Sequence, residues 1–129
     1  MNPITREWVD KAEGDFASAQ RELRARKSPN FDAACFHCHQ RIEKYLKARL
    51  HEVKIPFPKT HNLLTLLNLL LVIEPSWTFL QPDLQSLTTF AVSYRYPGIF
   101  ADKNAAREAL IRCRKVRGIV RQSLGLKEK

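Results

Sequence analysis

The sequence feature that most constrains the fold is the stretch from Asn30 to Leu50, in which apolar residues recur at three- and four-residue steps. At about 100° per residue, this spacing gathers them on one face of a helix. The apolar face consists of Phe31, Ala34, Cys35, Cys38, Ile42, Tyr45 and Leu46. The opposite arc carries basic and hydrogen-bonding side chains, namely His37, Gln40, Arg41, Lys44 and Lys47. We expect a helix that buries the first face and presents this basic arc to water or to a ligand.

The two ends of the chain follow the same helical spacing. The first helix is expected to begin at Asn2 or Thr5, either of which can cap it. Its buried stripe is Trp8, Ala12, Phe16, Ala19 and Leu23. The last helix is expected to begin after the cap Asp102 and to stop at Gly125. Its stripe is Ala106, Leu110, Cys113, Val116 or Arg117, Val120 and Leu124.

The middle of the chain predicts a third long helix, a short turn and a fourth helix. Residues 61–73 are apolar nearly all round, which predicts the most buried helix, with Thr60 as its cap. Ser76 is expected to cap the short turn through Trp77 and Leu80. The fourth helix follows Pro82-Asp83, and its stripe is Leu84, Leu87, Ala91 and Tyr94. No segment reads as a β-hairpin, so the expected fold is all-α, an up-and-down antiparallel bundle of about five helices in a single domain over residues 1–129.

The formal net charge of +9 favours polyanions such as nucleic acid or nucleotides, or an acidic protein partner. A basic helical protein with no such partner has the same composition. The N-terminus lacks the apolar core of a signal peptide, and residues 63–73 are too short to cross a bilayer. An odd number of cysteines, three, is more typical of free thiols in a core than of a disulfide framework. The sequence therefore predicts a cytoplasmic protein without a membrane span.

Cys35, Cys38 and His39 form a C-x-x-C-H sequence, the spacing used for covalent attachment of c-type haem. Both thiols fall on the apolar face of the helix, and the only methionine is Met1. A structural zinc site needs four ligands, and only Cys113 could add to these three. We therefore expect buried, metal-free core cysteines and no cofactor.

Tyr94-Arg95-Tyr96 precedes Pro97-Gly98, so that an arginine between two tyrosines stands at the end of the fourth helix. Arginine can bind a phosphate through two parallel hydrogen bonds, and tyrosines offer faces on which bases stack. The residues expected to bind a nucleotide or RNA are Arg95, Arg41, Lys44, His37, Gln40, Lys47, His61, Tyr94 and Tyr96. The alternative interpretation is that these are surface charges and helix-end packing. No residue is expected to be catalytic, because the sequence lacks a Gly-rich phosphate loop, clustered carboxylates and an H-E-x-x-H motif.

Four short patterns, in order along the chain, resemble the HEPN domain, a small all-helical domain named for its occurrence in higher eukaryotes and prokaryotes and for nucleotide binding. The first pattern is Trp8, Ala12 and Asp15-Phe16. The second is Phe36-His37, Gln40, Glu43-Lys44 and Leu46-Lys47-Ala48. The third and fourth are Thr60-His61 with Leu63 and Leu66, and Tyr94-Arg95-Tyr96-Pro97.

This resemblance implies a helical bundle that commonly dimerises and that is encoded in bacteria and archaea beside a minimal nucleotidyltransferase, as a toxin and antitoxin pair. Many members are metal-independent ribonucleases whose motif is an arginine, a polar residue and a histidine after four to six intervening residues. Arg95 is the counterpart of that arginine, but no histidine follows His61. The catalytic pair is incomplete, unless His37 or His61 lies beside Arg95 in the bundle.

Three hypotheses follow. The leading one is a HEPN-type protein that binds a nucleotide, RNA or a nucleotidyltransferase partner, with Arg95, Arg41 and Lys44 in one anion-binding site. The alternatives are an atypical ribonuclease toxin and a non-catalytic protein assembly module. We also predict a homodimer, because Trp77, Phe79 and Phe100 are candidates for exposed apolar surface.

Overall fold

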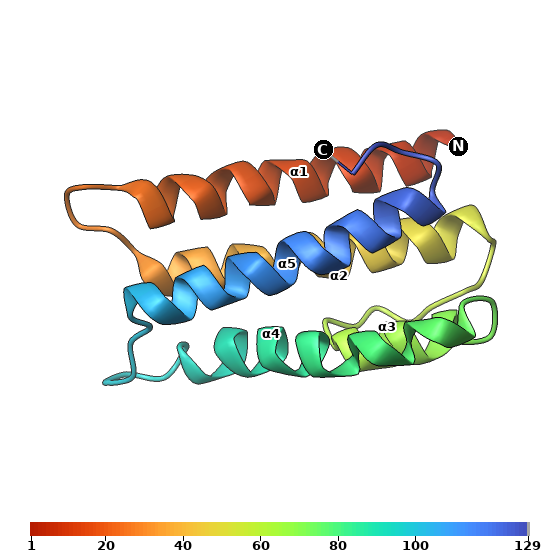
Figure 1. Ribbon diagram of the computed structural model, residues 1–129. Helices are drawn as coiled ribbons and strands as arrows, with labels where there is room; N and C mark the ends of the chain where they lie inside the picture. Colours follow the sequence, from red (N-terminus) through yellow and green to blue (C-terminus); the bar gives the residue numbers. More distant parts are fainter. Residues whose placement is uncertain (129) are drawn as a thin grey trace.

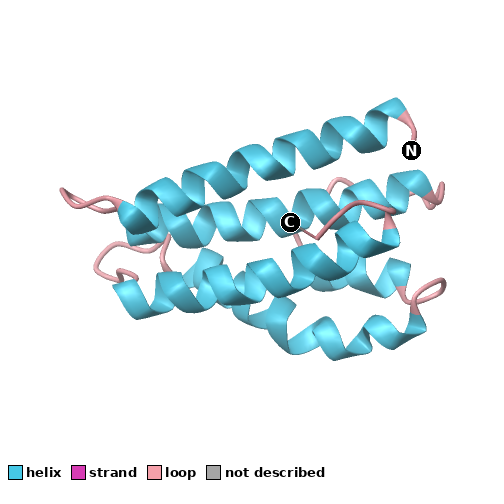
Figure 2. Ribbon diagram, turned by 45° about the horizontal axis from the view of Figure 1, so that its top comes forward, coloured by secondary structure: helices cyan, strands magenta, loops and turns pink. Residues whose placement is uncertain are grey.

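The structure, a computed structural model, describes residues 1–128. Within this range the chain forms only helices, joined by loops and turns (Figures 1 and 2). They are α1 (Pro3–Arg24), α2 (Phe31–Glu52), α3 (Leu63–Leu70), the 3-10 helix η1 (Pro75–Leu80), α4 (Gln81–Ser93) and α5 (Lys103–Ser123). The predicted all-α bundle is confirmed.

Helix α2 is the centre of the bundle and packs against α1, α5, α3 and α4. The long helices run antiparallel, with α1 on one side of α2 and the shorter α3 and α4 on the other (Figure 1). The end of α1, the start of α2, the end of α4 and the start of α5 meet at the left end of this view. This end of the bundle brings together segments from four parts of the sequence.

The predicted caps Asn2 and Asp102 are confirmed, and Asn30 caps α2 in the same way. The side-chain oxygen of Asn2 accepts a hydrogen bond from the backbone N of Thr5 at 2.8 Å. Asn30 accepts from Ala33 N at 2.9 Å, and Asp102 accepts from Ala105 N at 2.8 Å. Each cap satisfies an amide that has no partner inside its helix.

The third helix is shorter than predicted and has a different cap. Asn62, not Thr60, accepts hydrogen bonds from Leu64 N and Thr65 N, whereas the hydroxyl of Thr60 accepts from the backbone N of Asn62. The helix ends at Leu70, and a turn follows in which the backbone N atoms of Ile73 and Glu74 both donate to the Leu70 carbonyl, at 3.0 and 2.9 Å. Ser76 is also not a cap, since η1 begins at Pro75 with no side-chain cap.

The core is built around the apolar face of α2, and every member of that face except the partly buried Phe31 is buried. It meets the leucines of α3 and α4 and the predicted stripe of α5. Trp77 was predicted to be exposed, and this is wrong: it is only 4 % exposed and belongs to the core. Phe79 and Phe100 are exposed, as predicted. Among the described helices, none combines the length and the apolar character that a bilayer crossing requires.

Candidate functional site

The basic arc of α2 faces α1 rather than open solvent. The guanidinium of Arg41 is fully buried, lies 3.4 Å from the centre of the Phe16 ring and pairs with Glu13 at 3.4 Å. It also donates to the sulfur of Cys113 at 3.5 Å. The expectation of an exposed arc is therefore wrong at Arg41. Helical spacing places a polar stripe on one face, but it does not reveal that α1 carries acidic residues opposite that stripe.

The rest of the arc is also engaged inside the protein. Asp15 accepts from the ammonium of Lys44 and lies 3.0 Å from the Nδ1 atom of His37. Lys47 is buried, pairs with Glu43 at 3.1 Å and lies over the Trp8 ring. Gln40 is partly exposed. These contacts fix the position of α2 against its neighbours.

Glu13 is the acceptor of a cluster of donors that joins α1, α2 and α5. Its carboxylate receives the hydroxyl of Tyr45 and the Nε–H of Arg117, the latter at 2.8 Å. Burial acts to raise the pKa of Glu13, but the hydrogen bonds from Arg117 and Tyr45 outweigh it and leave that pKa below its ordinary value. The cluster is a structural network, and no pattern in the sequence indicated that Glu13 would be its centre.

Glu43 and His61 form a second pair on the other side of α2. The Nδ1 atom of His61 lies 2.9 Å from a carboxylate oxygen of Glu43. Glu43 is buried, whereas the side chain of His61 is 80 % exposed. A buried carboxylate that holds one nitrogen of an exposed imidazole leaves the other side of the ring toward solvent.

His39, the histidine of the C-x-x-C-H sequence, lies one helical turn before Glu43 on α2 and is a further functional candidate. It is buried, and its Nδ1 atom has no hydrogen-bond partner among residues 1–128. Burial lowers the pKa of His39, the charges of Arg95 and His61 lower it further, and Glu43 opposes them. His39 is therefore within electrostatic reach of both Arg95 and His61.

Arg95 lies in the turn that follows α4 and is exposed. Its guanidinium lies 5.5 Å from the centre of the Phe36 ring, and it forms no ion pair within the described part of the chain. It lines a hollow of about 270 Å³ together with Asn30, Asp32, Ala33, Phe36, Ala91 and Tyr94. The carboxylate of Asp32 accepts a hydrogen bond from the backbone N of Ala101 and forms no ion pair with Arg95. Tyr94 is partly buried and stacks on Phe90, whereas Tyr96 is exposed.

The structure thus separates the predicted site residues into two groups. The guanidinium of Arg95 lies over the Phe36 ring of α2. Arg41 and Lys44 instead contact acidic residues of α1. The arginine at the end of α4 and the two cations of the arc therefore do not share one pocket.

The cysteines are free and buried, as predicted. Burial, with Asp32 and Asp102 nearby, raises the pKa of Cys35 to about 12. The Cys113 thiol and burial raise the pKa of Cys38 as well. Protonated thiols inside the core are unsuited to haem attachment or to metal binding. No group of three or more potential metal ligands occurs among residues 1–128.

The fold and these residues define an all-helical antiparallel bundle with an exposed arginine in the turn after α4. The family model described as the HEPN domain matches residues 5–123 of the chain. The chain belongs to this family, and the membership supports a nucleotide- or RNA-associated helical protein. No curated protein and no solved structure gave a match to the chain.

Proposed function

We propose that this HEPN protein binds a nucleotide or RNA at the Arg95 pocket and acts as the partner of a minimal nucleotidyltransferase in a toxin-antitoxin-like pair. The binding proposal rests on the surroundings of the Arg95 side chain. Its guanidinium is exposed, has no carboxylate partner within residues 1–128 and lies against an aromatic ring. The other cations of the predicted site are already paired with acids.

An unpaired guanidinium at the mouth of a hollow can bind a phosphate through two parallel hydrogen bonds. Phe36 and the exposed Tyr96 supply aromatic surface on which a base can stack. His61, held by Glu43, adds a polar group on the same side of α2. In this proposal Arg41, Lys44, Lys47 and His37 hold α2 in place, and Gln40 lies on the rim of the site.

The test is binding of mononucleotides and of short single-stranded RNA by fluorescence anisotropy. The variant Arg95→Ala should weaken both by at least about 1 kcal/mol, or roughly fivefold, the scale of one charged hydrogen bond. Arg6→Ala removes an exposed arginine from the start of α1 and is the matched control. Equal affinity of the Arg95→Ala variant and the wild-type protein for both ligands would contradict the proposal.

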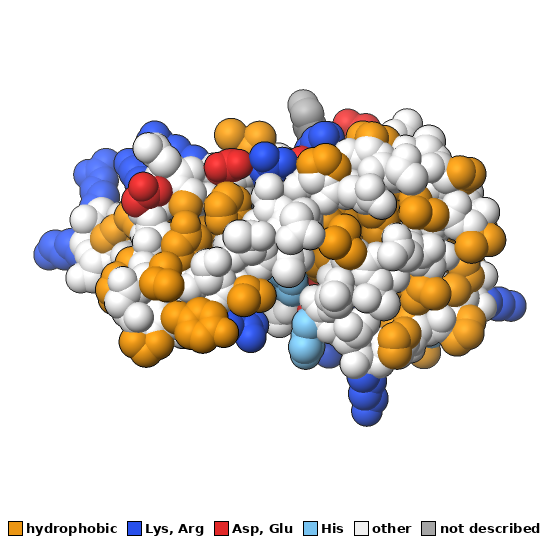
Figure 3. Space-filling model, turned by 90° about the horizontal axis from the view of Figure 1, so that it is seen from below, with side chains coloured by type: hydrophobic (Ala, Val, Ile, Leu, Met, Phe, Trp, Pro, Cys, Tyr) orange, Lys and Arg blue, Asp and Glu red, His pale blue; other side chains and the backbone are white. Residues whose placement is uncertain are grey.

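The protein partnership is proposed from the exposed apolar residues. Figure 3 shows the face of α3 and α4, where hydrophobic side chains are scattered and acidic ones are few. Val72, Phe79, Val92 and Phe100 are exposed large apolar residues of these and the adjoining segments. Such surface supports contact with another protein, either a second copy of the chain in a homodimer or a nucleotidyltransferase partner. A location in the cytoplasm is part of the same proposal. Sedimentation of a monomer at micromolar concentration would contradict the homodimer, and failure to co-purify with a neighbouring nucleotidyltransferase would contradict the pairing.

A metal-independent ribonuclease is the second candidate, and the Glu43–His61 pair favours it. Cleavage by the 2′-hydroxyl of RNA requires a group that removes a proton and a group that returns one to the leaving oxygen, and a carboxylate-held imidazole can serve in such a step. The purified protein would then cleave total RNA without added metal. Loss of cleavage in both Arg95→Ala and His61→Ala would support the enzyme. An assembly module, in contrast, would show neither cleavage nor nucleotide affinity.

A further inference from the structure

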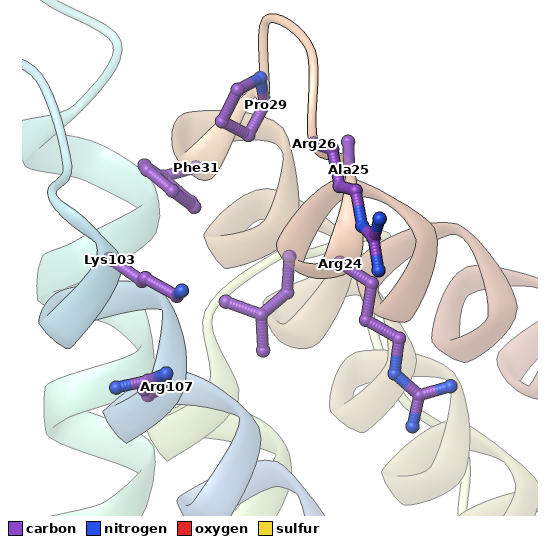
Figure 4. Close-up of a pocket in the computed structure, with 8 residues that line it drawn as sticks. Arg24, Ala25, Arg26, Pro29, Phe31, Lys103 and Arg107 are labelled. Carbon is purple, nitrogen blue, oxygen red and sulfur yellow. The ribbon is translucent and has the colours of Figure 1, made fainter.

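A groove lies between the end of α1 and the start of α5, on a part of the surface that none of the predicted site residues lines. Its volume is about 590 Å³. Figure 4 shows Arg24 and Arg26 on one side and Lys103 and Arg107 on the other, with Pro29 and Phe31 toward one end. Leu23, Pro29 and Phe31 add apolar surface to this basic lining.

The charge of this groove is not balanced by the protein. All four cations are exposed, and none of them forms an ion pair within residues 1–128. No acidic side chain lines the groove. The nearby acids are used elsewhere: Glu22 accepts from Asn30 N, Asp32 accepts from Ala101 N, and Asp102 caps α5. Elsewhere on the protein, cations are repeatedly paired with acids, as on the arc of α2.

A helix dipole explains only one of these four cations. Arg24 is in the last turn of α1, where a cation is favoured. Lys103, however, is the first residue of α5, where a cation is disfavoured, and the acid next to it, Asp102, is the helix cap. Arg26 and Arg107 lie outside the terminal turns. An anion bound beside Lys103 would offset the unfavourable position of that ammonium.

The groove continues toward Arg95 through two further hollows. It shares Pro29 and Phe31 with a hollow of about 470 Å³ that Phe100 also lines. That hollow in turn shares Asn30 and Asp32 with the Arg95 hollow. Phe100, which is 78 % exposed, thus stands between the basic groove and Arg95. The end of the bundle offers cations, then aromatic surface, then a further cation along one path.

We propose that this groove binds the phosphate backbone of a single-stranded RNA whose course continues past Phe100 to Arg95. Binding of single strands combines a basic channel for the backbone with aromatic side chains on which bases stack. A mononucleotide would occupy only one of the three hollows. The inference rests on the proposed function for the Arg95 contact, but the groove itself has its own test.

The test measures the affinity of a labelled single-stranded RNA of about 12 nucleotides, within the usual span of such sites, over a series of salt concentrations. The variant Arg24→Gln, Arg26→Gln, Lys103→Gln, Arg107→Gln removes four charges from the groove. Each lost phosphate contact reduces the slope of log affinity against log salt by about 0.7, so the slope should fall by about 3. Affinity at low salt should fall by a factor on the order of 10².

The matched control is Arg6→Gln, Lys11→Gln, Lys54→Gln, Lys59→Gln, which removes the same charge from exposed residues that do not line the groove. The control variant should change the slope by less than about half as much as the groove variant does, because it weakens only the general attraction between the basic protein and RNA. If the two quadruple variants change RNA binding equally, the proposal that the groove binds RNA is wrong. Stronger displacement of the RNA by polyglutamate than by unlabelled RNA would assign the groove to an acidic protein instead.

Mononucleotide binding separates this inference from the proposed function. If Arg95→Ala loses mononucleotide binding while the groove variant binds RNA as the wild-type protein does, the Arg95 site is supported and the groove proposal is wrong. If Arg95→Ala keeps mononucleotide binding while the groove variant loses RNA binding, the groove proposal is supported and the Arg95 site is wrong. Cross-linking of the wild-type protein tests the same path without a variant that could misfold. RNA that contains 4-thiouridine should cross-link to peptides that contain Phe31 or Phe100. Cross-links confined to other peptides would overturn the proposed path.

Discussion

The Nδ1 atom of His61 lies 2.9 Å from a carboxylate oxygen of Glu43, although the imidazole is largely exposed and the carboxylate is buried. The other carboxylate oxygen of Glu43 accepts from the buried ammonium of Lys47 at 3.1 Å. One acid thus neutralises a buried cation and positions a surface histidine. A substitution of Glu43 should therefore change both the stability of the protein and the position of His61.

The variant Glu43→Gln should therefore lower the free energy of unfolding by about 3 kcal/mol, because it leaves the buried ammonium of Lys47 without a counter-charge. Urea denaturation followed by circular dichroism measures the change. Glu7→Gln is the matched control, since Glu7 and Lys11 form an exposed pair with the same four-residue spacing. The control should change stability by less than about 0.5 kcal/mol. A similar small loss in Glu43→Gln would show that the Lys47 ammonium does not depend on this carboxylate.

The variant Arg41→Ala should destabilise the protein by about 3 kcal/mol or more, because it removes a buried guanidinium that packs on Phe16 and pairs with Glu13. Arg41→Met restores much of the lost volume, and Glu13 keeps its contacts with Arg117 and Arg121 at 2.8 and 3.6 Å. The methionine variant should therefore recover at least half of the loss. Arg114→Ala, at an exposed position of α5, should be nearly neutral. Chemical denaturation compares the three variants, and equal stability of Arg41→Ala and Arg114→Ala would contradict the structural role.

The stability of the protein should depend on pH through His39. Burial lowers the pKa of His39 in the folded state below its ordinary value of 6.5, so the unfolded chain binds the proton first as the pH falls. The stabilising contribution of the neutral imidazole is therefore complete above about pH 6.5 and decreases as the pH drops toward the folded-state pKa. The free energy of unfolding, measured by urea titration at several pH values, should decrease over this window.

The His39→Gln variant should flatten that decrease, whereas His61→Gln, which changes an exposed ring, should retain it. An unchanged pH profile in His39→Gln would assign the dependence to other groups.

The three thiols should react slowly in the folded protein. All are buried and so inaccessible to a reagent in solution. Burial also raises the pKa of Cys35 to about 12, and the hydrogen bond with Cys113, together with burial, raises the pKa of Cys38. Against the effect of its burial, the pKa of Cys113 is lowered by Cys38 and Arg41, so this thiol is protected by its inaccessibility alone. Ellman's reagent at about pH 8, near the ordinary thiol pKa, should label the native protein at a rate that follows unfolding. In guanidinium chloride all three cysteines should react within the mixing time. Rapid labelling of one thiol under native conditions would contradict the buried arrangement.

Much of the fold could be predicted from local patterns. The apolar face of α2, the caps Asn2 and Asp102, and the buried cysteines all follow from spacing and side-chain chemistry within a few residues. Two predictions were wrong, because the outcome depended on more than the local sequence. Thr60 and Asn62 are both good caps, and only the backbone path decided for Asn62. Trp77 was judged by its neighbours in sequence, whereas the packing of η1 on α3 and α4 buries it.

The sequence by itself determined that a basic, hydrogen-bonding stripe lies opposite the apolar face of α2, and that Arg95 stands at a turn. Only the tertiary structure decided which of these charges are free. Arg41 and Lys44 meet Glu13 and Asp15 of α1, whereas Arg95 forms no ion pair within residues 1–128, and Arg24 and Lys103 line a groove without an acid. The physical reason is that helical periodicity fixes the direction of a side chain around its own axis. The charge that it meets depends on which residues of another helix pack opposite it.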